Sequence, residues 1–168
     1  MISIVENPDK NFINIRAIAQ EVWPIAYKAI LSKEQLDYMM EMIYSVSSLQ
    51  KQANEFKNHF ILATENETPV GFASYELNYN QTLKTKIHKI YILSNQQGKG
   101  TGKLLIDYIL NQAKQNFQDA LLLNVNKYNT SRFFYEKLGF TLVGEEIIDI
   151  GNSYVMDDFI MEYLIKNN

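Results

Sequence analysis

The sequence predicts an α/β fold in which a central mixed, strongly twisted sheet of six to seven strands is flanked by four to five helices. Short apolar runs with two-residue spacing alternate with longer segments whose apolar residues recur at helical spacing. A largely apolar run over residues 120–125 follows one helical segment, which indicates a parallel strand-helix-strand unit. No linker, repeat or low-complexity segment divides the chain, so we expect a single domain over residues 1–168.

The N-terminus is expected to form a strand and then a helix. Ile2 and Ile4 lie at the two-residue spacing of a short strand. Asn7-Pro8-Asp9 then supplies a cap, a first-turn proline and an early acidic residue. The helix that follows ends or kinks at Pro24.

Two further helices and a hairpin are expected next. Ser32 and Gln35 have the spacing of a capping box, and the helix that they begin stops near Ser45. Ser47 or Ser48 is expected to cap a third, short helix. The hairpin has strands over residues 59–64 and 70–77, with a turn at 66–69 between them.

The C-terminal half begins with a strand over residues 84–93, which leads through a glycine-rich loop into a helix that ends near Asn116. After the buried strand over 120–125, Thr130 or Ser131 caps a short helix that ends at Gly139 as a left-handed cap. Two strands complete the chain, one from Phe140 and one through residues 159–165, with a turn at 151–152 and a polar bend at 157–158.

Composition excludes several classes of function. The net charge of -3 argues against non-specific nucleic-acid binding and is compatible with a cationic substrate. With no cysteine and only two histidines, the chain has no thiolate or histidine-rich metal site, and we expect no metal. No signal peptide is recognisable and no apolar run approaches the roughly 18 residues of a membrane span, so we expect a cytoplasmic protein without a membrane partner.

The glycine-rich loop predicts a phosphate site. Its three glycines stand at alternate positions ahead of a helix, where backbone N–H groups and the helix dipole attract an anion. A Walker loop fails because Gln97 stands where its first glycine belongs and Leu104 follows Lys103. A dinucleotide fingerprint fails because its third glycine is replaced by Lys103 or by Leu105, depending on the starting glycine. An ordinary strand-to-helix turn is the alternative.

The spacing that does fit is Gln97-x-x-Gly100-x-Gly102, which resembles the acetyl-CoA loop of the GNAT superfamily of N-acetyltransferases. Residues 134–140, Phe-Tyr-Glu-Lys-Leu-Gly-Phe, resemble the second signature of that superfamily. Residues 22–45 and 144–164 further resemble the branch that includes bacterial polyamine (spermidine and spermine) N-acetyltransferases. The resemblance implies the GNAT fold, acetyl-CoA as co-substrate and direct attack of an amine on the thioester.

The resemblance also assigns roles in acetyl-CoA binding. The loop amides would wrap the pyrophosphate, Lys99 and Lys103 would add positive charge, and the backbone at Ile90 and Ile92 would pair with pantetheine. The family asparagine stands seven positions before the tyrosine, where this chain has Tyr128, and Asn129 is the nearest candidate. The expected acetyl-CoA residues are Ile90, Tyr91, Ile92, Gln97, Gly98, Lys99, Gly100, Thr101, Gly102, Lys103, Asn129 and Tyr135.

Two residues are candidates for proton transfer. Tyr135 matches the family tyrosine that protonates the leaving thiolate, with a core aromatic as the alternative. Tyr135 is expected to lie at the margin of the face that Phe134 and Leu138 share. His88 is the candidate base, since relatives often carry a glutamate on this strand and this chain has no acid at those positions. The alternative for His88 is a half-buried, hydrogen-bonded strand histidine.

The acceptor is expected to be a small-molecule amine, either a polyamine or another small amine, because aromatic and acidic side chains together suit a cation. The candidate acceptor residues are Trp23, Tyr27, Tyr38 and Tyr44, with core aromatics as the alternative. Acetylation of a protein or peptide amine, and a CoA-binding regulatory module without turnover, remain open. A homodimer is also left open.

Overall fold

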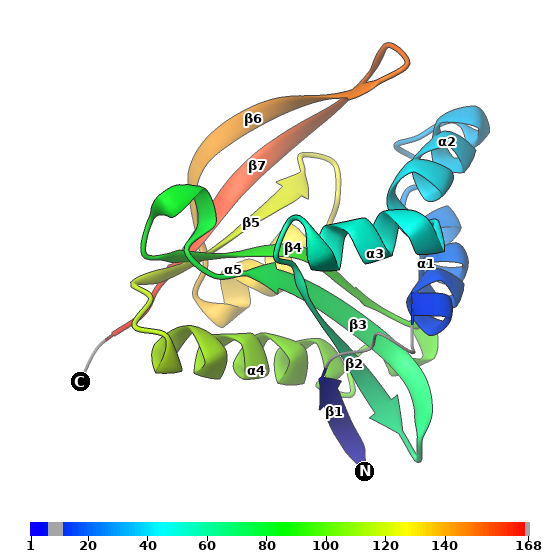
Figure 1. Cartoon of the computed structure of the whole chain (residues 1–168). Coiled ribbons are helices and arrows are strands. Elements are labelled where there is room, and N and C mark those ends of the chain that lie inside the picture. Colours follow the sequence, from blue (N-terminus) through cyan, green and yellow to red (C-terminus); the bar gives the residue numbers. More distant parts are fainter. Residues whose placement is uncertain (7–11, 167–168) are drawn as a thin grey trace. The chain divides into compact units, whose positions relative to one another are not determined.

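The structure is a computed structural model that describes residues 1–6 and 12–166. These residues form the predicted α/β fold, with a seven-stranded mixed sheet in the order β1-β2-β3-β4-β5-β7-β6 and five α-helices (Figure 1). The strands are β1 (Ile2–Glu6), β2 (His59–Glu65), β3 (Thr68–Glu76), β4 (Lys84–Ile92), β5 (Ala120–Asn126), β6 (Thr141–Gly151) and β7 (Tyr154–Leu164). The helices are α1 (Phe12–Ala26), α2 (Lys33–Tyr44), α3 (Val46–Asn54), α4 (Thr101–Gln115) and α5 (Arg132–Leu138), with short 3-10 turns η1 (Tyr79–Gln81) and η2 (Ser94–Gln96).

The chain divides into two compact units. The first consists of Met1–Glu76 and His88–Ile109, and the second of Leu77–Ile87 and Leu110–Asn168. Strand β4 and helix α4 each contribute residues to both units. No helix in the described ranges combines the length and the apolar character needed to cross a membrane.

The first unit is built on antiparallel strands covered by helices. Strand β1 pairs with β2, and β2 pairs with β3 through a tight turn in which Asn66 and Glu67 both have positive φ. Helix α1 packs on β3 and contacts α2 and α3. Ile15 and Ala19, one turn apart on α1, are fully buried, as the predicted helical spacing requires.

The helix caps confirm one prediction and correct another. Ser32 caps α2, its side chain accepting a hydrogen bond from the Gln35 N–H at 3.1 Å. Helix α3 is capped by Ser45 rather than by the predicted Ser47 or Ser48, because the Ser45 side chain accepts from the Ser48 N–H at 3.3 Å. Pro24 lies inside α1, which ends two residues later, and the predicted cap at 7–9 lies outside the described residues.

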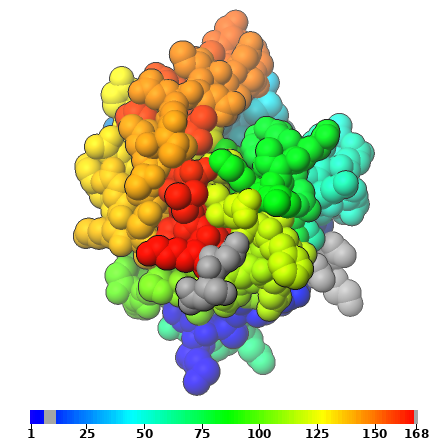
Figure 2. Space-filling model, turned by 90° about the vertical axis from the view of Figure 1, so that its left-hand side faces the viewer, coloured from blue at the N-terminus to red at the C-terminus, as the bar shows by residue number. Residues whose placement is uncertain are grey.

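The second unit contains the parallel pair that the sequence predicts. Strand β5 pairs in parallel with β4 over Lys84–Ile87 and antiparallel with β7. Strands β6 and β7 form a long hairpin whose turn lies at Gly151 and Asn152, as predicted. Figure 2 shows these two strands, orange to red, at the molecular surface, and β6 is exposed along most of its length.

The predicted polar bend at Asp157 and Asp158 is wrong, because both residues lie inside β7. Adjacent strand residues face opposite sides of a sheet, so the two aspartate side chains have different polar partners. Asp157 forms an ion pair with Lys127 at 2.9 Å. Asp158 lies across from Glu146 of β6 and Asn126 of β5, and it accepts a hydrogen bond from Asn124 at 3.4 Å.

Helix α5 ends as predicted at Gly139, whose φ of 101° is left-handed. It begins directly after Ser131, one of the two predicted caps, but the Ser131 side chain makes no capping hydrogen bond. Instead the Asn129 side chain accepts a hydrogen bond from the Ser131 N–H at 2.9 Å.

Candidate functional site

The glycine loop joins β4 to α4 in the first unit. Gly98 and Gly100 have φ values of 77° and 84°, which favour glycine, whereas Gly102 lies in the first turn of α4. Apart from the adjacent residues of the chain, no atom lies within 4 Å of the position that a Cβ would take at Gly98 or Gly100. The backbone of the loop therefore faces open space, as a cradle for a ligand requires.

The loop presents a set of unused donors. In the described part of the chain we find no hydrogen-bond acceptor for five N–H groups, whereas the next one, of Leu104, donates to the Gly100 carbonyl at 2.9 Å. These five belong to Gly98, Gly100, Thr101, Gly102 and Lys103. Such donors at a helix N-terminus, with the dipole behind them, form an anion site. The residues present therefore fit the pyrophosphate of a CoA molecule.

The two lysines of the loop differ in their surroundings. Lys103 forms an ion pair with Asp107, one turn further along α4, at 2.5 Å. Lys99 is exposed and has no ion pair among residues 1–6 and 12–166. The positive charge of Lys99 is thus the less compensated of the two for an anionic ligand.

A buried glutamine that sequence reasoning missed supports the loop. Gln96 is fully buried in η2 and donates from Nε2 to Glu65 Oε2 of β2 at 2.9 Å. Its Oε1 accepts from the Thr101 hydroxyl at 3.2 Å, which ties the loop to the first residue of α4. The predicted motif residue Gln97 is exposed.

The end of β4 leads directly into the loop. Within the first unit the segment His88–Ile92 neighbours β3 only, so it is an edge strand there. Ile90, Tyr91 and Ile92 are half-buried, and the Tyr91 hydroxyl lies 3.0 Å from that of Tyr27. An edge strand has backbone groups to which an extended ligand such as pantetheine can pair.

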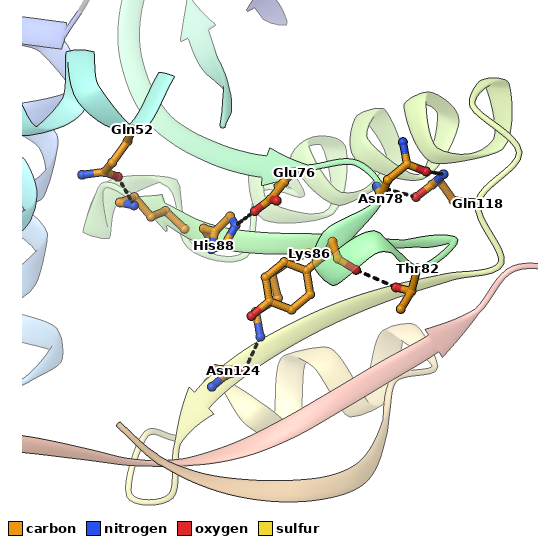
Figure 3. A network of polar contacts seen from close by, with 10 residues as sticks. Gln52, Glu76, Asn78, Thr82, Lys86, His88, Gln118 and Asn124 are labelled. Carbon is orange, nitrogen blue, oxygen red and sulfur yellow. Dashed lines mark hydrogen bonds and ion pairs between the residues drawn. The ribbon is translucent and has the colours of Figure 1, made fainter. Parts of the chain in front are cut away.

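His88 has an acidic partner that the sequence did not reveal. Its Nε2 lies 2.9 Å from Glu76 Oε2 at the end of β3 (Figure 3). Both side chains are about one quarter exposed, at 25% and 24%. The strand of His88 lacks an acid, as noted from the sequence, but the neighbouring strand supplies one.

The next residue on β4, Lys89, is half-buried and makes no carboxylate contact among the described residues. Its Nζ donates to Gln52 Oε1 of α3 and lies 5.9 Å from the centroid of the Phe60 ring. Burial lowers the pKa of Lys89 from 10.5 to about 8. Sequence alternation places Lys89 on the strand face opposite to His88.

The predicted acceptor residues lie mainly in the core of the first unit. Trp23, Tyr27 and Tyr44 are buried, and the Trp23 ring centroid lies 4.6 Å from Tyr27 and 5.3 Å from Tyr44. Burial raises the pKa of Tyr44 well above its usual value. Tyr38 of α2 is half-buried. The burial of the first three matches the core alternative, and acceptor contact stays a prediction for all four.

Tyr135 and Asn129 lie in the second unit. Tyr135 is buried, with its ring centroid 5.9 Å from Phe140, while Phe134 is exposed. The expectation that Phe134 points inward and Tyr135 lies at the margin is therefore wrong. Helical spacing defines a face but not which neighbouring face the sheet covers.

A second polar cluster, also missed from the sequence, joins three strands of the second unit. The Lys86 Nζ donates to Asn124 Oδ1 (Figure 3). The Asn124 Nδ2 in turn donates to Glu146 Oε2 at 2.9 Å. Burial lowers the pKa of Lys86 and raises the pKa of Asp158 beside it. These residues are too far apart along the chain for spacing to connect them.

Comparison with known proteins agrees with this geometry. Residues 27–156 match the family model of the acetyltransferase (GNAT) domain. A [ribosomal protein bS18]-alanine N-acetyltransferase of Haemophilus influenzae is 37% identical over 79 residues, which cover 47% of this chain and 52% of that protein. A 5-NmdU N-acetyltransferase of Pseudomonas phage PaMx11 is 29% identical over 118 residues, which cover 62% of this chain and 82% of that protein. The chain thus spans about half the length of the first relative.

A solved structure shares the fold. The PaiA N-acetyltransferase of Thermoplasma acidophilum, in complex with coenzyme A, superposes with a TM-score of 0.81 at 24% identity and covers 98% of this chain and 99% of that one. The match to the family extends over most of the chain and includes both the glycine loop and Tyr135. The chain therefore belongs to the GNAT family of N-acetyltransferases.

Proposed function

We propose that the protein transfers the acetyl group of acetyl-CoA to a primary amine by direct attack of the amine on the thioester. The observation that carries the proposal is the set of five N–H donors between Gly98 and Lys103 for which the described residues offer no acceptor, a few residues after the edge strand His88–Ile92. A phosphate cradle next to an edge strand suits a ligand with a pyrophosphate at one end and a chain of amides at the other. The fold shared with a CoA-bound relative supports the same ligand.

The chemistry requires three proton transfers. An ammonium has no lone pair, so the acceptor first gives a proton to a base, for which we propose His88. The amine nitrogen then bonds to the acetyl carbon, the C–S bond breaks, and the new amide nitrogen loses its second proton. The leaving thiolate takes up one proton, for which we propose the Tyr135 hydroxyl as the donor. The net products are the acetylated amine, CoA with a free thiol and one proton.

We consider three candidates, of which two are acceptor classes and one is a function without an acceptor. A polyamine or another small amine is the first candidate, and the net charge of -3 favours a cationic acceptor. A protein amine is the second candidate, because the Haemophilus influenzae relative is named for acetylation of an alanine of ribosomal protein bS18. A regulatory module that binds CoA without turnover is the third.

The test is release of free thiol from acetyl-CoA in the presence of polyamines, other small amines and peptides with a free N-terminus. Thiol release that depends on the acceptor supports the enzyme, and the best acceptor distinguishes the first two candidates. Tight CoA binding without thiol release for any amine would leave the regulatory module. The variant Gly100→Asp serves as a control that lacks the cradle.

A further inference from the structure

We infer that Glu76 is a positioning residue that holds the proton on Nε2 of His88, makes Nδ1 the basic nitrogen, and stabilises the imidazolium once His88 is protonated. The inference rests on the proposed function where it concerns catalysis. The pair itself, however, is a property of the first unit and can be measured without turnover.

The geometry fixes the direction of the hydrogen bond. A carboxylate only accepts hydrogen bonds, so at 2.9 Å the His88 Nε2 must donate to Glu76 Oε2. In a neutral imidazole one nitrogen carries the proton and the other carries the lone pair. With the proton on Nε2, the lone pair belongs to Nδ1, and Nδ1 is the atom that accepts a proton from an acceptor amine or from an intervening water.

The charge of Glu76 also matters after proton uptake. An opposite charge at hydrogen-bond distance favours the charged form of histidine, although about one quarter of each side chain is exposed and water weakens the interaction. Other charged groups on β4 act less directly. Lys89 faces the opposite side and is held by Gln52, and Lys86 shares the strand face of His88 two residues earlier.

The pair also explains why the sequence lacked a base of the expected kind. In relatives the glutamate is expected on β4, at the positions of Lys86 or His88, whereas the carboxylate here comes from the last residue of β3. The proton acceptor and the negative charge are thus divided between two strands. An imidazole is intrinsically a stronger base than a carboxylate, so the division places the stronger base on β4 and the negative charge on β3.

The experiment compares the wild-type protein with Glu76→Gln by ¹⁵N NMR of labelled histidines across pH. The chain has only two histidines, so the spectrum is simple, and His59→Gln assigns the remaining signals to His88. Glu76→Gln keeps an oxygen that accepts from Nε2 and removes only the charge. We expect Nε2 to carry the proton in the wild type, and the midpoint of the His88 titration to fall by about one pH unit in Glu76→Gln.

The rate profile adds a catalytic readout. In Glu76→Gln we expect the acidic limb of kcat to move to lower pH with the titration and the maximal rate to fall about tenfold, with an unchanged KM for acetyl-CoA. Glu67→Gln, an exposed carboxylate in the turn before β3, is the matched control and should change neither readout. Glu76→Asp keeps the negative charge, so its His88 titration midpoint should lie between that of Glu76→Gln and that of the wild type.

The outcomes distinguish a failure of the inferred role of Glu76 from a failure of the proposed acetyltransferase function. A proton on Nδ1 in the wild type, or the same His88 titration in both proteins, overturns the role of Glu76. Absence of acetyl transfer in the wild type overturns the proposed function, while the titration still decides whether Glu76 positions His88. A changed rate with an unchanged titration also contradicts the inference, because a purely structural effect of Glu76 would have that result.

Discussion

The side-chain amide of Gln96 joins Glu65 of β2, at 2.9 Å, to the Thr101 hydroxyl at the start of α4, at 3.2 Å. Gln96 and Thr101 are both fully buried. Each end of the amide therefore has a partner of the required kind, with an acceptor facing its NH₂ and a donor facing its oxygen. This single side chain fixes the beginning of the loop relative to the sheet of the first unit.

Gln96→Glu should destabilise the fold in a pH-dependent way, because it places a second carboxylate against Glu65. We expect a loss of about 1–3 kcal/mol at pH 7, measured by chemical denaturation. In the folded variant each carboxylate disfavours ionisation of the other, so the pair binds a proton more tightly than in the unfolded chain. The loss of stability caused by Gln96→Glu should therefore shrink as the pH falls toward 4. Gln97→Glu, at the exposed neighbouring position, is the control and should change stability by less than about 0.5 kcal/mol. Equal effects of the two changes would contradict the assigned role of Gln96.

Gly100→Asp should abolish CoA binding, and Gly100→Asn separates the two causes. Aspartate and asparagine have nearly the same shape, and both would have to adopt the left-handed φ of 84° at this position. Only aspartate adds a negative charge at the cradle. We expect affinity for CoA, measured by calorimetry, to be about 10- to 100-fold lower in the aspartate variant than in the asparagine variant. High salt should narrow this difference. Binding preserved in both variants would mean that the loop is not the pyrophosphate site.

The local features of the fold could be predicted from the sequence because their signals are local. The Ser32 cap, the left-handed Gly139 and the glycine loop each depend on residues within a few positions of one another. The order of strands and helices followed from their apolar spacing for the same reason. Among the strands the exception was β7, where two adjacent aspartates indicated a bend although each has its own polar contacts.

The supporting residues of the site could not be predicted in this way. Gln96 and Glu65 are 31 residues apart, and His88 and Glu76 are 12 apart on neighbouring strands. Nothing in the sequence states which strands are neighbours or in what register, so neither pair has a spacing that identifies it. The motif spacing also selects the adjacent Gln97, which is exposed, and not the buried Gln96.

Lys89→Met should stabilise the protein at neutral pH. Burial lowers the pKa of Lys89 from 10.5 to about 8, and this shift corresponds to a cost of about 3 kcal/mol for holding the charged amine in the fold. Below pH 8 that cost is fully present, and it is relieved as the pH rises from 8 toward 10.5, because the unfolded chain then binds more protons than the folded one. We expect Lys89→Met to gain about 1–3 kcal/mol at pH 7 and to lose part of the rise in stability between pH 8 and 10.

The control for this change is Lys51→Met on α3, whose side chain is 57% exposed, forms a long ion pair with Glu55 and has its Nζ 5.6 Å from the centroid of the Phe56 ring. Its stability should stay within about 0.5 kcal/mol of the wild type at every pH. Lys86, whose pKa is also lowered by burial, is present in all three proteins, so differences between them report Lys89 alone. A wild-type stability curve that is flat above pH 8 and parallel to that of Lys89→Met would contradict the prediction.

Gly71→Ala should disturb the end of β4 without touching the loop. A Cβ at Gly71 of β3 would lie 2.8 Å from Ile92 Cγ2 and 3.0 Å from the Tyr91 carbonyl oxygen, and the carbonyl cannot move without moving the strand. We expect a loss of stability of about 1–3 kcal/mol and weaker CoA binding, because Tyr91 and Ile92 lead directly into the cradle. Gly144→Ala in β6 is the matched control, since its Cβ would meet Ile160 at an ordinary 3.7 Å. Thermal denaturation and calorimetry with CoA measure both effects, and equal Tm values for the two variants would show that β4 does not need the close approach that glycine permits at this position.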